Sequence, residues 1–313
     1  MMNKAIKPFP KKPISLARRF ESEWQIYLLL LPAMAYIIIF EYLPMYGIQV
    51  AFRDYKAVQG ILGSRWVGLE HYRTFFSSFY WKRLLVNTFL LNFYGLIWGF
   101  PVPIILALLL NRVEYPRMKK FTQTAIYIPH FISTVVIAGM IYMFLSPTNG
   151  IINRLIVALG GKSIFFMVAP EWFRTVFIAS GIWQGAGWGT IVYLAALTSI
   201  DPEMYEAATI DGATILQKIR YIDIPSIIPI AMMLLILNSG SMLSSNTQKA
   251  LLLQTSGNIP TSDIIGLYIY NVGLGQAKFS YTAAIGLLLN VINFFIIMTV
   301  NTISKKTSEI SMI

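Results

Sequence analysis

The feature that most constrains this chain is a series of long apolar stretches without charged residues. The hydrocarbon core of a bilayer is about 30 Å thick, and a helix needs roughly 20 apolar residues to cross it. The stretches of this kind are 24–40, 84–110, 121–153, 175–200, 224–248 and 279–304. The sequence therefore predicts an all-α membrane protein with six transmembrane helices.

Two apolar regions depart from a simple crossing. The stretch 121–153 is too long for one span, and Pro147 predicts that the chain turns back near Ser146. A further run, 250–259, is too short to cross, and the glycine and proline at its end predict a loop or a re-entrant piece. These breaks leave the predicted number of spans at six.

Composition excludes several other classes of protein. Hydrophobic residues make up 56% of the 313-residue chain and charged residues only 12%, whereas soluble domains carry roughly a quarter charged residues. The absence of cysteine and the presence of only two histidines argue against disulfides, thiolate nucleophiles and metal sites. With no hydrolase, zinc-protease or dinucleotide-binding motif, the sequence predicts neither enzymatic activity nor a bound metal.

The net charge of +11 is compatible with nucleic-acid binding or with an asymmetric membrane protein. Basic residues gather in the first 23 residues, in the loop near 112–120 and after 304, which six spans place on one side of the membrane. The positive-inside rule predicts that this side, with both termini, is cytoplasmic, so no nucleic-acid partner is expected. The predicted domains are a basic tail (1–23), a transmembrane domain (24–304) and a carboxyl-terminal tail (305–313).

The loop between the fourth and fifth predicted spans, residues 201–225, is unusual because it carries acidic residues on the basic side. It reads DPEMYEAATIDGATILQKIRYIDIP. Asp201 followed by Pro202 predicts the start of a short helix, and Gly212 predicts the left-handed turn that closes it. A second helical stretch is predicted over 213–221. This loop is either a solvated acidic surface or a docking element for a cytoplasmic partner.

The second interpretation is favoured by a specific resemblance. The letters EAA at 206–208, Gly212 six residues after Glu206, and I-x-I-P at 222–225 resemble the EAA loop of ABC importer permeases. In that family the pattern ends in I-x-L-P, so Ile224 replaces the usual leucine. The segments 40–55, 66–72, 127–133 and 193–213 also resemble the polysaccharide-type (LplB-like) permeases.

The resemblance implies the type I importer fold, with the EAA helix seated in a groove of a cytoplasmic ATPase. It implies a multi-pass protein of the bacterial cytoplasmic membrane that imports oligosaccharides and works with a second permease, two ATPase subunits and an extracytoplasmic solute-binding protein. ATP and magnesium are expected on the ATPase, and no cofactor on this chain. The residues expected to form the ATPase contact are Glu206, Ala207, Ala208, Asp211 and Gly212.

Polar and aromatic side chains within the spans are candidates for the substrate path. They are Trp183, Gln184, Tyr193, Asn238 and Asn290, and a serine cluster at 239–245 lies beside them. Polar residues in a membrane tend to face a cavity, although hydrogen bonds between helices explain them equally well. Because none of these side chains is charged, they favour an uncharged glycan.

Glycines recur at four-residue spacing in two of the spans. They are Gly181, Gly185 and Gly189 in one and Gly95 and Gly99 in the other. This spacing is typical of closely packed membrane helices, and it is also compatible with a sliding contact against a second permease. An autonomous secondary sugar transporter is the alternative function. Such proteins usually show inverted repeats and ionisable residues inside the membrane, and this sequence shows neither.

Overall fold

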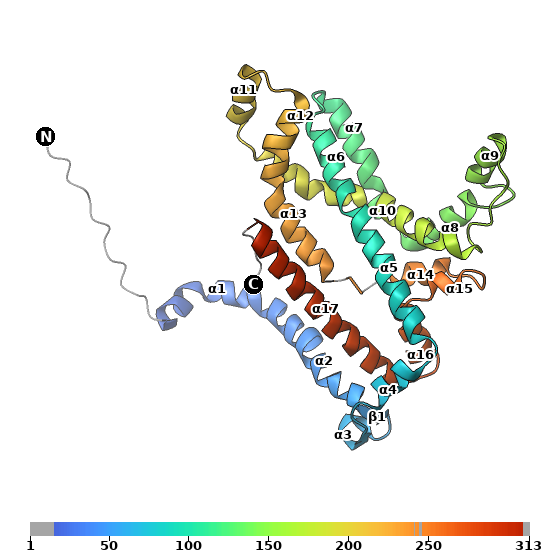
Figure 1. The fold of residues 1–313 in the computed structure, drawn as a ribbon. Coiled ribbons are helices and arrows are strands. Elements are labelled where there is room, and N and C mark those ends of the chain that lie inside the picture. Colours follow the sequence, from blue (N-terminus) through green and yellow to red (C-terminus); the bar gives the residue numbers. More distant parts are fainter. Residues whose placement is uncertain (1–15, 241, 244–245, 309–313) are drawn as a thin grey trace.

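The structure is a computed structural model that describes residues 16–240, 242–243 and 246–308, with side chains from residue 24 to 305. The first 15 residues of the predicted basic tail, and Ser241, Ser244 and Ser245 of the serine cluster, lie outside the described residues. Helices dominate the fold (Figure 1). The long or central ones are α1 (Leu16–Ile37), α5 (Trp81–Gly99), α6 (Pro101–Asn111), α7 (Pro116–Tyr127), α8 (Thr134–Phe144), α10 (Pro170–Thr198), α13 (Ile224–Ser239) and α17 (Phe279–Ser308).

Shorter elements connect these helices. They are the π-helix η1 (Ile38–Tyr42), α2 (Leu43–Met45), the 3₁₀-helix η2 (Tyr46–Phe52), β1 (Arg53–Lys56), α3 (Gly60–Gly63), β2 (Ser64–Trp66), α4 (Glu70–Ser77), η3 (Ile128–Phe131), α9 (Ile151–Ala158), α11 (Pro202–Ile210), α12 (Ile215–Lys218), the π-helix η4 (Ile219–Asp223), α14 (Thr247–Leu253), α15 (Ile259–Ser262) and α16 (Ile265–Gly273). The strands β1 and β2 form an antiparallel pair in which Arg53 lies opposite Trp66.

Four helical runs among the described residues are long and apolar enough to cross a membrane: Trp24–Phe52, Trp81–Asn111, Ile215–Ser239 and Phe279–Lys305. A fifth is obtained if the bent pair Pro116–Phe131 and Thr134–Phe144 counts as one span. The predicted number of six is therefore not reproduced exactly. The predicted span that is not reproduced is α10, which has 29 residues but contains Gln184, several glycines and three tryptophans that reduce its hydropathy.

The structure corrects two predicted boundaries and adds a bend to a third span. The first span was expected to end near Glu41, but the helical run continues through Pro44 to Phe52, because Pro44 occupies the first turn of α2, where no backbone donor is needed. The fifth was expected to reach residue 248 and ends at Ser239. The third ends at Phe144 as expected, but it also bends by 101°, where the Ser133 side chain caps a new helix.

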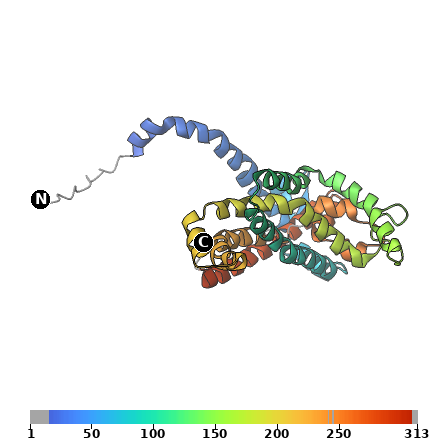
Figure 2. The ribbon, with the colours of Figure 1, turned by 90° about the horizontal axis from the view of Figure 1, so that it is seen from above.

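The two ends of the molecule are built differently (Figure 1). The α11–α12 loop and the connection between α6 and α7 lie together at one end. The β1–β2 pair, α3 and α4 lie at the opposite end, beside the start of α17. Figure 2 shows that α1 extends away from the body formed by the other helices, and its most apolar segment is not buried within the chain.

The helix α10 organises the interior. It packs along α6, α5 and α13 and contributes to two of the three apolar clusters. One cluster joins Phe173 of α10 to α8 and α14, and another joins Leu197 of α10 to α6 and α13. Only three residues separate the end of α10 from the start of α11.

Candidate functional site

The α11–α12 loop adopts the local structure that its sequence predicts. The Asp201 side chain accepts a hydrogen bond from Glu203 N at 3.0 Å, and Pro202 is the first helical residue. Gly212 has a φ of 74°, in the left-handed region that glycine tolerates best. The second helix was expected over 213–221, and it is formed by α12 and η4, which a Thr214–Gln217 capping box begins.

The surface of this loop combines small, acidic and large apolar side chains. Of the predicted ATPase-contact residues, Glu206, Ala207, Asp211 and Gly212 are exposed and Ala208 is half-buried. The neighbouring exposed apolar side chains are Met204, Ile210, Ile215 and Leu216. We call these four residues the apolar rim. Exposed apolar groups of this kind on an ordered loop are typical of a binding surface.

A buried cluster attaches α11 to the rest of the fold. The hydroxyl group of Tyr205, on α11, donates a hydrogen bond to Asp223 Oδ1 at 2.5 Å. Arg112, at the end of α6, forms an ion pair with the other oxygen of Asp223, and its guanidinium lies 5.3 Å from the centre of the Tyr205 ring. Asp223 is 0% exposed. This carboxylate therefore joins the loop to α6 and to the helix that continues into α13.

The electrostatics of the cluster favour the neutral form of Tyr205. Burial, followed by the hydrogen bond to Asp223, raises the pKa of Tyr205 to about 12, so its hydroxyl group remains a donor throughout the physiological pH range. Sequence reasoning did not identify this cluster. The available signal was Asp223 itself, a carboxylate within an otherwise apolar segment, but nothing local indicates its partner 111 positions away.

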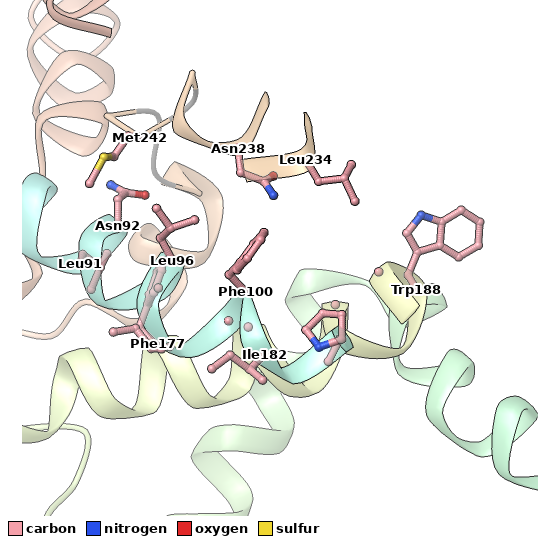
Figure 3. Close-up of a pocket in the computed structure, with 18 of the residues that line it drawn as sticks. Leu91, Asn92, Leu96, Phe100, Phe177, Ile182, Trp188, Leu234, Asn238 and Met242 are labelled. Atoms are coloured by element: carbon pink, nitrogen blue, oxygen red, sulfur yellow. The ribbon is translucent and has the colours of Figure 1, made fainter. Parts of the chain in front are cut away.

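A cavity of about 600 Å³ lies between α5, α6, α10 and α13. In Figure 3, Leu234 and Asn238 of α13 lie across from Leu96 and Phe100, and Trp188 of α10 lies at one side. Both glycine rows, 95 and 99 on α5 and 181, 185 and 189 on α10, line this space. The rows therefore leave room for the cavity.

The tightest helix contact of a glycine in α10 is made by Gly187, between two members of the row. A Cβ atom at this position would collide with the carbonyl oxygen of Ile126, next to the end of α7, whereas a Cβ atom at Gly185 would meet nothing within 4 Å. Within the row, Gly189 is also closely packed, because a Cβ atom there would be 3.1 Å from Pro103 Cγ in α6. The row therefore both borders the cavity and packs against α6, and the tightest contact is made by a glycine that the spacing did not single out.

The predicted substrate-path residues fall into two groups. Tyr193 and Asn238 line the cavity. Trp183 and Asn290 are exposed and do not line it, and Gln184 donates a hydrogen bond from Nε2 to Ile132 O at 3.0 Å. The cavity thus brings together two of the five residues. Among the described residues, no group of three or more His, Cys, Asp or Glu side chains is placed to hold a metal ion.

Comparisons with known proteins agree on one family. Residues 82–309 match the sequence profile of the family described as "binding-protein-dependent transport system inner membrane component". From Bacillus subtilis strain 168, the polygalacturonan/rhamnogalacturonan transport system permease protein YteP is 43% identical over 284 residues (91% of this chain, 88% of YteP). Protein LplB of the same strain is 40% identical over 298 residues (95% of this chain, 94% of LplB).

A solved structure is similar over nearly the whole chain. It is a chain of a bacterial ABC transporter involved in the import of the acidic polysaccharide alginate. The TM-score is 0.86 at 38% sequence identity, and the match covers 94% of this chain and 99% of the other. A second structure of the alginate transporter, in complex with an alginate pentasaccharide-bound periplasmic protein, matches with the same TM-score at 37% identity.

Proposed function

Because this chain belongs to the family of binding-protein-dependent transport system inner membrane components, we propose that it forms part of the translocation path for an oligosaccharide and receives its energy through α11. It is a multi-pass membrane protein and a permease subunit of an ATP-driven importer. It is not itself catalytic and binds no cofactor of its own, since ATP hydrolysis in such importers belongs to a separate subunit.

The observation that carries the proposal is the α11–α12 loop. It has a well-defined local structure, exposes the apolar rim beside Glu206, and is joined to α6 and η4 through Asp223. A loop that only faced water would not need four exposed apolar side chains. We propose that Glu206, Ala207, Ala208, Asp211 and Gly212 contact the ATPase and that the apolar rim is buried there.

The remaining parts of the importer follow from this assignment. We propose two ATPase subunits, a second permease and an extracytoplasmic solute-binding protein, with the α11 end and both termini of this chain in the cytoplasm. The end that carries β1, β2 and α4 then faces the binding protein. Tyr193 and Asn238 are proposed as substrate contacts, because they line the cavity at the centre of the fold, and the related permeases are named for polysaccharides.

The alternative function, a secondary sugar transporter, predicts uptake driven by an ion gradient without ATP. The exposed loop favours the ATP-driven mechanism, because a transporter that worked alone would leave the apolar rim in water.

The test is the substitution Glu206→Lys in the complete importer. Glu206 is exposed, so the substitution should leave the chain folded in the membrane. It should abolish co-purification of the ATPase and reduce ATP-dependent uptake by at least tenfold.

The matched control is Glu70→Lys. Glu70 is also exposed, in the first turn of α4 at the opposite end, and its reversal should not change ATPase binding. Wild-type uptake and co-purification by the Glu206→Lys variant would refute the coupling assignment. Uptake that persists without ATP would favour the secondary transporter.

A further inference from the structure

Lys249 is a buried cation beside the central cavity. It lies in α14, the short helix that follows α13, and the residue as a whole is only 3% exposed. Burying an ammonium group costs several kcal/mol unless other groups compensate. A lysine retained in such a place is therefore a candidate for a functional residue.

The surroundings of Lys249 supply little negative charge. Its Nζ atom donates a hydrogen bond to the carbonyl oxygen of Phe177 at 2.8 Å and lies 4.8 Å from the centre of the Phe177 ring. Within the described part of the chain the ion pairs are Arg83–Asp263 and Arg112–Asp223, so no carboxylate lies within 4.0 Å of Lys249 there.

The ammonium group lies directly behind the cavity wall. A Cβ atom built at Gly181 would be 3.4 Å from Lys249 Nζ, and both Gly181 and Phe177 line the cavity. Because glycine has no side chain, residue 181 places only its backbone between the ammonium group of Lys249 and the cavity. Among the described residues that line the cavity, none is Asp, Glu, Lys or Arg, so the charge of Lys249 acts on this space from just behind its wall.

This arrangement changes what the sequence predicted. The polar side chains of the spans are uncharged and favoured an uncharged glycan, and the residues that line the cavity are indeed uncharged. Lys249 gives the same space a positive potential, because a charge within a poorly solvated wall is weakly screened. A carboxylate entering the cavity would be attracted, whereas a neutral sugar would gain nothing from the charge.

We propose that Lys249 is a specificity-determining residue that selects oligosaccharides bearing carboxylates, that is, chains of uronic acids. This proposal rests on the proposed function of the chain as an oligosaccharide permease. It adds the chemical class of the substrate and the group that recognises it. Gly181 of α10 is part of the same arrangement, because its lack of a side chain brings the cavity close to the ammonium group.

The test compares two probes that differ in charge alone: the trisaccharide of galacturonic acid and its methyl ester. Uptake is measured in proteoliposomes that contain the complete importer and excess binding protein, for wild type, Lys249→Gln, Lys249→Met and Lys249→Arg. The amide of Lys249→Gln can still donate to Phe177 O, and Lys249→Arg keeps the charge.

Lys249→Gln and Lys249→Met should each lower uptake of the acidic trisaccharide at least tenfold and change uptake of the ester less than twofold. Lys249→Arg should retain at least a third of the wild-type rate for the acid. ATPase activity stimulated by the loaded binding protein should persist in all variants, because Lys249 is remote in the chain from the α11 loop.

Three results would overturn the proposal. Equal losses for acid and ester, or a failure of both neutral variants to assemble with the ATPase, would make Lys249 a structural residue. Unchanged uptake of the acid by both neutral variants would show that its charge is not used. Failure of wild type to import the acidic trisaccharide with ATP would overturn this inference but not the proposed function, which the Glu206→Lys variant tests separately.

Discussion

Two ion pairs, at opposite ends of the molecule, illustrate two ways of fixing a loop. At the α11 end Arg112 pairs with Asp223, which is 0% exposed. At the β1–β2 end Arg83 of α5 pairs with Asp263 at 2.6 Å, and their side chains are 32% and 17% exposed. Both arginine side chains are partly exposed, at 26% for Arg112 and 32% for Arg83, so the pairs differ mainly in the burial of their carboxylates.

The two pairs also differ in what supports them. Next to Asp263, the Asn87 side chain donates to the carbonyl oxygens of Pro260 and Asp263, and Arg174 donates to Asn87 Oδ1. Several hydrogen bonds therefore hold that segment in addition to the ion pair. At the α11 end, Tyr205 and Arg112 both depend on the single carboxylate of Asp223. The loop at the α11 end therefore depends on a single carboxylate, whereas the segment around Asp263 is held by several weaker interactions.

The largest expected difference in stability is between variants that each lack one of the two carboxylates, Asp223 or Asp263. Asp223→Ala leaves a half-buried guanidinium and a half-buried hydroxyl group without their partner, and should destabilise the chain by about 3 kcal/mol, the lower end of the range for a fully buried pair. Asp263→Ala should cost about 1 kcal/mol or less, because its pair is partly solvated and Asn87 remains. Thermal unfolding of the detergent-purified variants measures both. Equal decreases in melting temperature would contradict the comparison.

An intermediate effect is expected from two glycines with left-handed backbones. Gly212 and Gly60 have φ values of 74° and 66°, and a Cβ atom at either meets nothing within 4 Å. Alanine at each position should therefore cost about 1–2 kcal/mol through backbone strain alone. Only Gly212→Ala should also reduce the uptake driven by each hydrolysed ATP. If Gly60→Ala uncouples transport to the same extent, the α11 end has no special role.

The smallest effect on stability is expected from exposed apolar residues. Ile210 of the apolar rim is 87% exposed, and Val58 at the opposite end is 100% exposed. Serine at either position should change the free energy of unfolding by no more than about 0.5 kcal/mol. Ile210→Ser should nevertheless weaken binding of the ATPase about tenfold, since an isoleucine buried at an interface contributes about 1.5 kcal/mol or more. Titration of the ATPase onto each reconstituted variant measures this, and unchanged binding would argue against the rim as an interface.

Short-range signals explain what the sequence could predict. The Asp201 cap, the Pro202 start and the Gly212 turn each depend on neighbouring residues, so the bounds of α11 could be predicted from the sequence of the loop alone. The same holds for the end of α8 at Phe144, just before Ser146 and Pro147. Family membership could also be predicted, because the EAA pattern is long and its spacing is fixed.

Contacts between distant segments could not be read in this way. Asp223 binds Arg112 across 111 positions, and Lys249 lies against Phe177 across 72, and no local pattern encodes either contact. The glycine row on α10 was visible, but its role depends on which face of the helix meets α7, and only Gly187 meets it. The described helices give four or five candidate spans against the six predicted, and the difference is α10, which is long but less apolar than the other candidates.

The direct connection between α10 and α11 has a mechanical consequence. With 29 residues, α10 is about 43 Å long at 1.5 Å per residue, and its residues 181–193 form one wall of the cavity. A tilt of roughly 5° about the α11 end would move Gly181, about 26 Å from that end of the helix, by about 2 Å. The helix is therefore a lever arm, and a modest rotation of α11 would be enough to change the width of the cavity.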